Sequence, residues 1–192
     1  MLPLLLASSS VYRRELLARL RLPFTCSSPD IDESHRPGES AIDLVKRLAE
    51  EKARALAGTH PAHLIIGSDQ VAVLGDRIIG KPHTFEKARE QLLASSGASV
   101  TFLTGLAVLN SEYGHCQVDC VPFTVHMRTL DAARIERYLR AEQPYDCAGS
   151  FKAEGLGVSL FKSTEGPDAT SLVGLPLIRL IDMLLAENVQ IP

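Results

Sequence analysis

The chain has 192 residues, of which 45% are hydrophobic and 22% charged, and its formal net charge is -3. This composition indicates a globular protein with one well-buried core, or two small lobes that share one, and excludes a disordered chain. The slight negative charge offers no general attraction for nucleic acid or an anionic membrane, so we expect neither as a partner. Four scattered cysteines favour a reducing compartment, which predicts a cytoplasmic protein.

The apolar segment at residues 2–7 is predicted to contain the first strand of a sheet, over Leu4–Ala7. No basic residues precede this segment and it is far too short to span a bilayer, so we expect neither a signal peptide nor a membrane span. A charged amphipathic pattern follows directly, which predicts a helix from Ser10 to about residue 20.

Arg13 lies on the apolar face of that helix. Leu16, Leu17 and Leu20 form the inward stripe, and Arg13 precedes them by three, four and seven residues. The other charged residues of the helix fall off this stripe: Arg14, Glu15 and Arg19. A buried cation without a partner costs several kcal/mol, so we expect Arg13 to face an anion or a wet cleft.

The second predicted helix, from Ser40 to Ala57, repeats this pattern. Ser40 is its expected N-cap, with Asp43 completing a capping box. Lys52 lies on the apolar face, four residues after Leu48 and four before Leu56. The other charges are expected mostly on the far side: Asp43, Lys46, Arg47, Glu50, Glu51 and Arg54. Two core-facing cations suggest a phosphate-binding site, so we expect Lys52→Met to relieve desolvation rather than to harm folding.

The remaining elements alternate between strands and helices. Strands are expected at His63–Leu74, Arg77–Lys81, Val100–Asn110, Gln117–Arg128 and in a short segment ending at Phe161. Helices are expected from Thr84 to Gly97, over Asp131–Ala141 and from Pro176, with Gly75-Asp76 as a two-residue hairpin turn. This succession predicts an α/β or α+β fold around a mixed sheet, in one compact unit without linkers or repeats.

Asp69 is the strongest catalytic candidate. It interrupts an apolar strand, where a carboxylate needs a metal, a cation or a proton, and the alternative is a structural Asp bonded to backbone N–H groups. Glu33, in the acidic loop Pro29–Glu39, is expected to join Asp69 on a divalent cation, because carboxylate oxygens suit Mg²⁺ or Mn²⁺. Asp32 competes for that position, and a solvated surface acid is the alternative for both.

Lys81 lies in Gly75-Asp-Arg-Ile-Ile-Gly80-Lys81-Pro82, a near match to the phosphate-loop pattern. Pro82 excludes that motif, because it lacks both the hydroxyl that would hold Mg²⁺ and a backbone N–H. An ideal hairpin register pairs Lys81 with Gln70, beside Asp69, which puts a cation at the same end of the sheet. The alternative is an exposed lysine on an edge strand.

Two weaker signals concern other ligands. Ser8 and Ser10 lie between the first strand and the first helix, where free N–H groups and the helix dipole favour phosphate. His115, Cys116 and Cys120 resemble a zinc site only superficially, because strand spacing sets the cysteines too far apart for one ion.

Seven short motifs, in order from about residue 4 to residue 185, resemble the Maf family of nucleotide pyrophosphatases. They are Ala7-Ser8-x-Ser10 with Arg13, Asp32-Glu33, Glu51-Lys52-Ala53, Gly67-x-Asp69, Gly80-Lys81-Pro82, Ala148-Gly149-Ser150 and Val173-Gly174-Leu175-Pro176-Leu177. One departure is Val11, where family members usually have proline. This difference affects the start of the helix more than the chemistry.

The resemblance implies one domain over residues 1–192, with a two-lobed mixed-sheet α/β fold similar to inosine triphosphate pyrophosphatases and the active site in the cleft between the lobes. It implies metal-dependent hydrolysis of a nucleoside triphosphate between the α and β phosphates, with Asp69 activating water and Asp69 and Glu33 holding Mg²⁺ or Mn²⁺. The residues expected to bind the substrate phosphates are Ser8, Ser10, Arg13, Lys52 and Lys81. The partner is a small-molecule nucleotide, and whether the chain is a monomer or a homodimer stays open.

Three positions indicate a branch of this family. Members that prefer dTTP and UTP typically have Arg, Thr and Gln where this chain has Tyr12, Gln70 and Glu154, which are similar to the branch that hydrolyses 7-methyl-GTP. A 7-methylated guanine is cationic, so stacking on an aromatic ring adds a cation–π attraction of about 1–2 kcal/mol. A carboxylate accepts hydrogen bonds from guanine N1–H and its 2-amino group. The alternatives are a dTTP/UTP pyrophosphatase and a non-catalytic nucleotide-binding regulator of septum formation.

Overall fold

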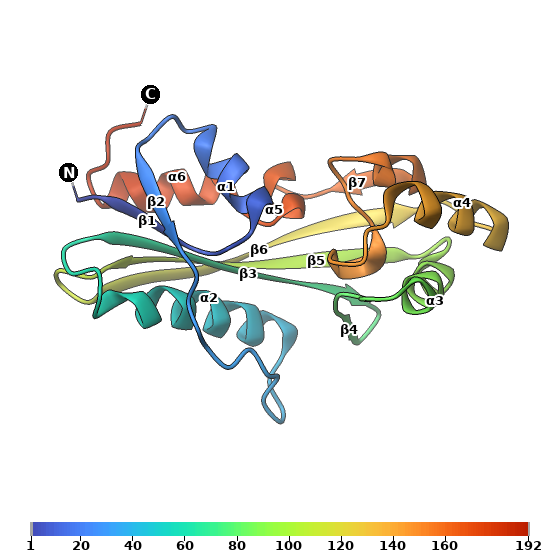
Figure 1. Ribbon diagram of the computed structural model, residues 1–192, viewed down its shortest axis with the longest axis horizontal. Coiled ribbons are helices and arrows are strands. Elements are labelled where there is room, and N and C mark those ends of the chain that lie inside the picture. The colour runs from blue at the N-terminus through green and yellow to red at the C-terminus, as the bar shows by residue number, and fades with distance from the viewer. Residues whose placement is uncertain (1, 192) are drawn as a thin grey trace. The chain divides into compact units, whose positions relative to one another are not determined.

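The structure is a computed structural model that describes residues 2–191 (Figure 1). Its chain divides into two compact units. Unit 1 holds the chain up to Gln70, Thr104–Val121 and the chain from Asp168 onward, and unit 2 holds Val71–Leu103 and Pro122–Pro167. Three strands contribute residues to both units: β3 (Leu64–Leu74), β5 (Ser99–Asn110) and β6 (His115–Met127).

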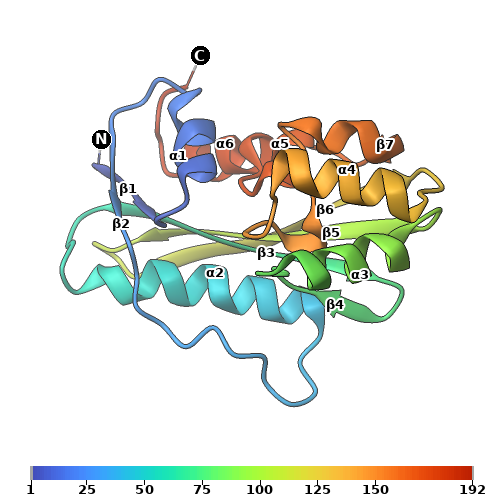
Figure 2. The ribbon, with the colours of Figure 1, turned by 45° about the vertical axis from the view of Figure 1, so that its right-hand side comes forward.

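Unit 1 combines parallel strand pairs with helices on both faces. Its strand order is β2-β1-β3-β5-β6, and β1 pairs in parallel with both β2 and β3. Its other elements are β1 (Leu4–Ala7), α1 (Val11–Ala18), β2 (Phe24–Ser27), α2 (Ala41–Ala57), α5 (Ala169–Val173) and α6 (Leu177–Ala186). Within this unit α2 covers one face of the strands, and α1 and α6 cover the other (Figures 1 and 2).

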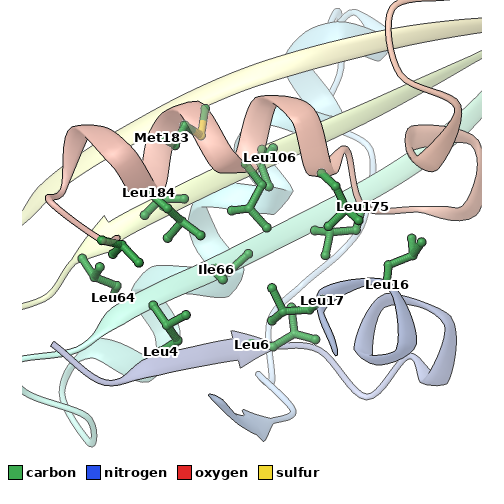
Figure 3. Close-up of a cluster of buried hydrophobic side chains, with 14 residues drawn as sticks. Leu4, Leu6, Leu16, Leu17, Leu64, Ile66, Leu106, Leu175, Met183 and Leu184 are labelled. Carbon is green, nitrogen blue, oxygen red and sulfur yellow. The ribbon is translucent and has the colours of Figure 1, made fainter. Parts of the chain in front are cut away.

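Alternation along the strands of unit 1 creates two separate apolar layers. Leu4, Leu64 and Leu106 belong to the layer that α1 and α6 cover, which Figure 3 shows. Their neighbours Leu5, Ile65 and Ala107 point the other way and pack against α2. Because side chains alternate with period two, the residues of β3 that belong to unit 1, up to Gln70, are thereby assigned to one of these two faces.

Glycines allow α2 to lie directly on the strands. A Cβ at Gly67 of β3 would overlap the backbone carbonyl of Ala49, and one at Gly105 of β5 would overlap that of Val45. Both glycines therefore serve close helix–sheet contact rather than an unusual backbone angle. This contact brings residues on the inner face of α2 within reach of those that follow Gly67.

Unit 2 is built from antiparallel pairs and two helices. Strand β4 (Arg77–Ile79) pairs with β3, and β7 (Phe161–Glu165) pairs with β6, both antiparallel. Its helices α3 (Phe85–Ser95) and α4 (Ala132–Glu142) pack against each other. Two short 3₁₀ segments, η1 (Ala148–Ser150) and η2 (Leu156–Leu160), lie between α4 and β7.

Most of the predicted elements are confirmed, including the mixed sheet and the N-cap at Ser40. Ser10, Ser40, Thr84 and Asp131 each accept a hydrogen bond from a backbone N–H of the first turn. In the Ser40 cap the Asp43 carboxylate accepts from the serine hydroxyl at 2.6 Å. Within residues 2–191, no helix is long and apolar enough to cross a membrane.

Three predictions are wrong: the strand that ends at Phe161, the pairing of Lys81 with Gln70, and the extension of the Arg77 strand to Lys81. The short strand predicted to end at Phe161 begins there instead, because the carbonyl of Lys152 accepts from the N–H groups of Gly155 and Gly157 and closes turns upstream. The Lys81–Gln70 pairing does not form, because the β3–β4 ladder ends at Ala72–Ile79. Lys81 lies outside β4 and is exposed, beside a proline that cannot donate to a ladder. Strand β2 and helix α5 were not predicted.

Candidate active site

Lys52 of α2 joins the two carboxylates predicted to form the site. Its Nζ lies 2.7 Å from Asp69 Oδ1 and 2.9 Å from Glu33 Oε1. Lys52 is 7% exposed and Asp69 is 8% exposed, so both charges are buried. The anion expected at Lys52 is therefore provided by the protein itself, and Lys52 and Asp69 form a nearly water-free ion pair.

The position of Asp69 follows from the alternation of β3. Ile65, Gly67 and Asp69 share the face that packs on α2, and Lys52 occupies the corresponding inner face of that helix. Because Gly67 carries no side chain, the helix backbone lies close enough for Lys52 to reach the carboxylate two residues further along. The spacing Gly67-x-Asp69 thus has a structural reason.

Glu33, rather than Asp32, reaches the buried pair. Asp32 Oδ1 accepts the backbone N–H of Ser34 at 2.9 Å, and this bond lowers the pKa of Asp32 below its ordinary value. The Asp32 side chain thus closes a local turn, while Glu33 Oε1 contacts Lys52. Of the two acids, Glu33 is therefore the one that contacts the buried pair.

Glu33 and Asp69 fit a divalent cation. They already share one cation, the ammonium of Lys52, and their oxygens are the donors that Mg²⁺ and Mn²⁺ prefer. Mg²⁺ is commonly bound by one or two carboxylates plus substrate phosphates and water. Within residues 2–191, no three His, Cys, Asp or Glu side chains come together as a metal site, so a small carboxylate set is what this chain offers.

Arg13 is held at the start of α1 by two neutral groups. Its Nε donates to the carbonyl of Gly174 at 2.8 Å, and its Nη1 lies 3.5 Å from Ser8 Oγ. Burial lowers the pKa of Arg13 from its ordinary value, and the negative charges of Asp69 and Glu33 act against that shift. Arg13 thus brings a second cation close to the carboxylates, and within residues 2–191 it forms no ion pair of its own.

Ser8 and Ser10 order the loop between β1 and α1. Ser8 Oγ accepts the N–H of Ser10 at 3.1 Å, and Ser10 Oγ accepts the N–H of Arg13 at 3.3 Å. Each hydroxyl accepts in these bonds and keeps its own proton for donation. Both residues retain the ability to donate to an anion at the N-terminus of α1.

Gln70 and Tyr12 belong to unit 1, and Gln70 points away from the face of Asp69. Gln70 Nε2 donates to Thr104 Oγ1 at 2.9 Å and to the carbonyl of Ser171 at 2.7 Å. Since a backbone carbonyl only accepts, the amide nitrogen of Gln70 is committed to the protein and its oxygen is left for other contacts. Tyr12, on α1, is half-buried.

Lys81 and Glu154 belong to unit 2, where both are exposed. Gln91 of α3 anchors the segment before Lys81: its Nε2 donates to the carbonyl of Gly80 at 3.2 Å, and its Oε1 accepts from the hydroxyl of Ser150. Gln91 therefore links the motifs Gly80-Lys81-Pro82 and Ala148-Gly149-Ser150.

Ser68 supports the site and was not predicted from the sequence as a site residue. Ser68 donates to the carbonyls of Gly105 and Gly174, at 2.8 and 3.0 Å, and so fixes the carbonyl that holds Arg13. Its position next to Asp69, as a second polar residue in an apolar strand, was the available signal.

Cys116 and Cys120 are half-buried on β6, and burial raises the pKa of each thiol to about 11.

The site thus combines a lysine buried against two carboxylates with a serine loop that leads into an arginine-bearing helix. The family described as Maf-like protein matches residues 3–187, and the chain belongs to this family.

Individual relatives give a closer comparison. A 7-methyl-GTP pyrophosphatase of Pseudomonas fluorescens is 89% identical over 100% of both chains. A 7-methyl-GTP pyrophosphatase of Pseudomonas aeruginosa is 72% identical over 98% of both chains. A HAM1 protein from Coxiella burnetii has a similar structure, with a TM-score of 0.51 at 14% identity over 97% of this chain and 100% of the other. This last likeness concerns the fold alone and confirms the predicted mixed α/β class.

Proposed function

We propose that this chain is a nucleoside triphosphate pyrophosphatase that hydrolyses 7-methyl-GTP between the α and β phosphates, releasing the monophosphate and pyrophosphate. The observation that carries the proposal is the buried Asp69–Lys52 pair with Glu33 beside it, in a chain whose full-length relatives bear the name 7-methyl-GTP pyrophosphatase. The cytoplasm, with its reduced thiols and nucleotide pool, is the proposed compartment, and the nucleotide is the proposed partner.

Asp69 is the proposed general base. Its Oδ1 accepts from Lys52, and within the described chain no bond to its Oδ2 is found, so one oxygen remains for a water molecule. The ammonium of Lys52 is the counter-charge of this buried carboxylate, and a general base must act in its deprotonated form. Asp69 and Glu33 would hold Mg²⁺ or Mn²⁺, which when bound would neutralise triphosphate charge and polarise a phosphoryl oxygen.

The cations and hydroxyls are assigned to the phosphates. Lys52 is buried and Arg13 is partly buried, and attraction between a cation and developing negative charge is stronger in such surroundings than in water. Ser8 and Ser10 would donate hydrogen bonds from the start of α1. Lys81 of unit 2 is proposed as a third cation.

Three further residues are proposed to select the base of the nucleotide: Tyr12, Gln70 and Glu154.

The test is turnover of the purified protein on 7-methyl-GTP, GTP, dTTP and UTP at equal concentration, with Mg²⁺ or Mn²⁺, scored by released pyrophosphate. We expect 7-methyl-GTP to be cleaved fastest, and Asp69→Asn to lose about a hundredfold or more of that rate, as is typical when a general base is removed. Faster cleavage of dTTP and UTP would instead assign the pyrimidine branch. Binding of nucleotides without turnover would favour the regulator.

A further inference from the structure

We propose that Arg47 and Glu39 are positioning residues that hold Glu33 against Lys52. The kinetic part of this inference rests on the proposed function, because only that function assigns Glu33 a role as a metal ligand. Glu33 itself is poorly restrained: its side chain is 58% exposed, and Lys52 is the partner that the structure gives it. An exposed glutamate loses side-chain entropy when it is held in one rotamer, so its place depends on the loop that carries it.

Arg47 clamps that loop onto α2. Its Nε and Nη2 donate to the two carboxylate oxygens of Glu39, at 2.6 and 2.9 Å, which is the paired geometry that makes such bonds strong. Its Nη2 also donates to the carbonyl of Ser34 at 3.0 Å. Ser34 directly follows Glu33, so the clamp acts one residue away from the predicted metal ligand.

A second arginine closes the network from the side of the loop. Arg36 donates to Glu51 Oε1 at 2.9 Å, while Arg47 donates to Glu51 Oε2 at 3.0 Å. The backbone N–H of Arg36 also donates to Glu39 Oε2 at 3.1 Å. The network thus alternates positive and negative charges, with Arg36 and Glu39 from the loop and Arg47 and Glu51 from α2. Arg47 and Glu39 are its least exposed members, at 13% and 9% of their side chains.

The geometry excludes a direct role for Arg47 in binding phosphate. Four of its five N–H groups are already donated to Glu39, Glu51 and Ser34. The sequence placed Arg47 among the charges on the far side of the helix, and on that side Glu39 and Ser34 of the loop cover it. Groups that orient metal ligands in this way typically change metal affinity or activity 10- to 100-fold when removed.

The experiment compares Arg47→Met with Arg54→Met. Arg54 lies on the same helix and pairs with Glu50 at 2.7 Å. Among the described residues it has no other ion pair, so its removal is a matched loss of one arginine outside the loop network. The first measurement is hydrogen exchange of the backbone amides at residues 31–39 in the protein without metal or nucleotide. The second is kcat/KM for 7-methyl-GTP as a function of Mg²⁺ concentration.

We expect Arg47→Met to speed exchange in the loop roughly 10-fold and to raise the Mg²⁺ concentration needed for half-maximal rate about 10-fold, while Arg54→Met changes neither. Unchanged exchange would overturn the clamp, and faster exchange with unchanged Mg²⁺ dependence would overturn the positioning role. An inactive wild-type protein would instead contradict the proposed function, and exchange alone would then decide the clamp. Glu39→Gln gives the same comparison if Arg47→Met does not fold.

Discussion

Lys52 Nζ and Asp69 Oδ1 lie 2.7 Å apart, both buried, one on helix α2 and the other on strand β3. The two charges depend on each other, because neither is stable at this depth without the other. The pair therefore links the stability of the sheet–helix contact to the chemistry proposed for Asp69. A substitution at either position tests both.

Lys52→Met is expected to lower stability by about 3–5 kcal/mol, because it leaves the Asp69 carboxylate buried without a counter-charge. For a chain of this size that corresponds to a fall in Tm on the order of 10 °C. Thermal unfolding at pH 7, followed by circular dichroism, measures this fall. The direction is opposite to the one that the sequence suggested, since the sequence did not show that Lys52 has a partner within the protein.

The double variant Lys52→Met/Asp69→Asn provides the control. Removing both charges leaves a neutral amide beside an apolar side chain, so most of the lost stability should return. Full wild-type stability in the single variant Lys52→Met would mean that the ion pair contributes nothing to folding.

Gly67→Ala is expected to be strongly destabilising, by about 3 kcal/mol or more, because the added methyl group would overlap the carbonyl of Ala49 and backbone cannot move aside as a side chain does. Gly58→Ala is its control. Gly58 has φ of -65° and no atom within 4 Å of an added Cβ, so we expect stability within about 1 kcal/mol of wild type. Urea unfolding of both variants checks the contrast, and similar costs for the two would contradict direct contact between α2 and β3.

The charge network around Glu39 predicts a specific dependence on pH. The hydrogen bond from Arg47, aided by the N–H of Arg36, lowers the pKa of Glu39 from 4.5 to about 2. The ionised form is thus favoured in the folded state, so its contribution to stability is full above pH 4.5 and is lost as the pH falls from 4.5 towards 2.

Glu39→Gln should therefore be less stable than wild type at pH 7, and the difference should shrink below pH 4.5. The measurement is the free energy of unfolding of both proteins at several pH values, taken as a difference so that other titrating groups cancel. A difference that stays constant from pH 7 to pH 3 would show that Glu39 is not ionised through this network.

The sequence predicted the helices, the long strands and the buried acid well, because these depend on local periodicity. Leu16 and Leu17 repeat at helical spacing, and Asp69 breaks an apolar strand. Strand β2 was missed because two of its four residues, Thr25 and Cys26, are exposed and show no apolar run. Helix α5 was missed because its five residues are too few to show a period.

The candidate site could be predicted as a set of residues but not as a set of contacts. Arg13 and Lys52 were recognised because they interrupt apolar faces. Their partners are set by packing between segments distant in the sequence, such as the bond from Arg13 to Gly174, which spans 161 residues. No local pattern contains that information.

The last prediction separates two roles of Gln70, a structural one and the selection of the base. Gln70→Thr introduces the residue typical of the pyrimidine branch. Threonine is too short to replace the bond of Gln70 Nε2 to Ser171, but Thr104 still donates to that carbonyl at 3.0 Å. We therefore expect a modest loss of stability, about 1 kcal/mol. Gln70→Glu should cost more, because a carboxylate oxygen would then face the carbonyl of Ser171.

The kinetic measurement is the ratio of kcat/KM for 7-methyl-GTP to that for dTTP. If the oxygen of Gln70 helps to select the base, Gln70→Thr lowers this ratio, whereas a purely structural residue affects both substrates equally. Ser95→Ala is the stability control, since Ser95 is also buried and bonded to a carbonyl, that of Gln91 at 2.8 Å, but belongs to unit 2 and to none of the motifs. An unchanged ratio in Gln70→Thr, with stability reduced as in Ser95→Ala, would make Gln70 a structural anchor of α5 and remove it from the residues proposed to select the substrate.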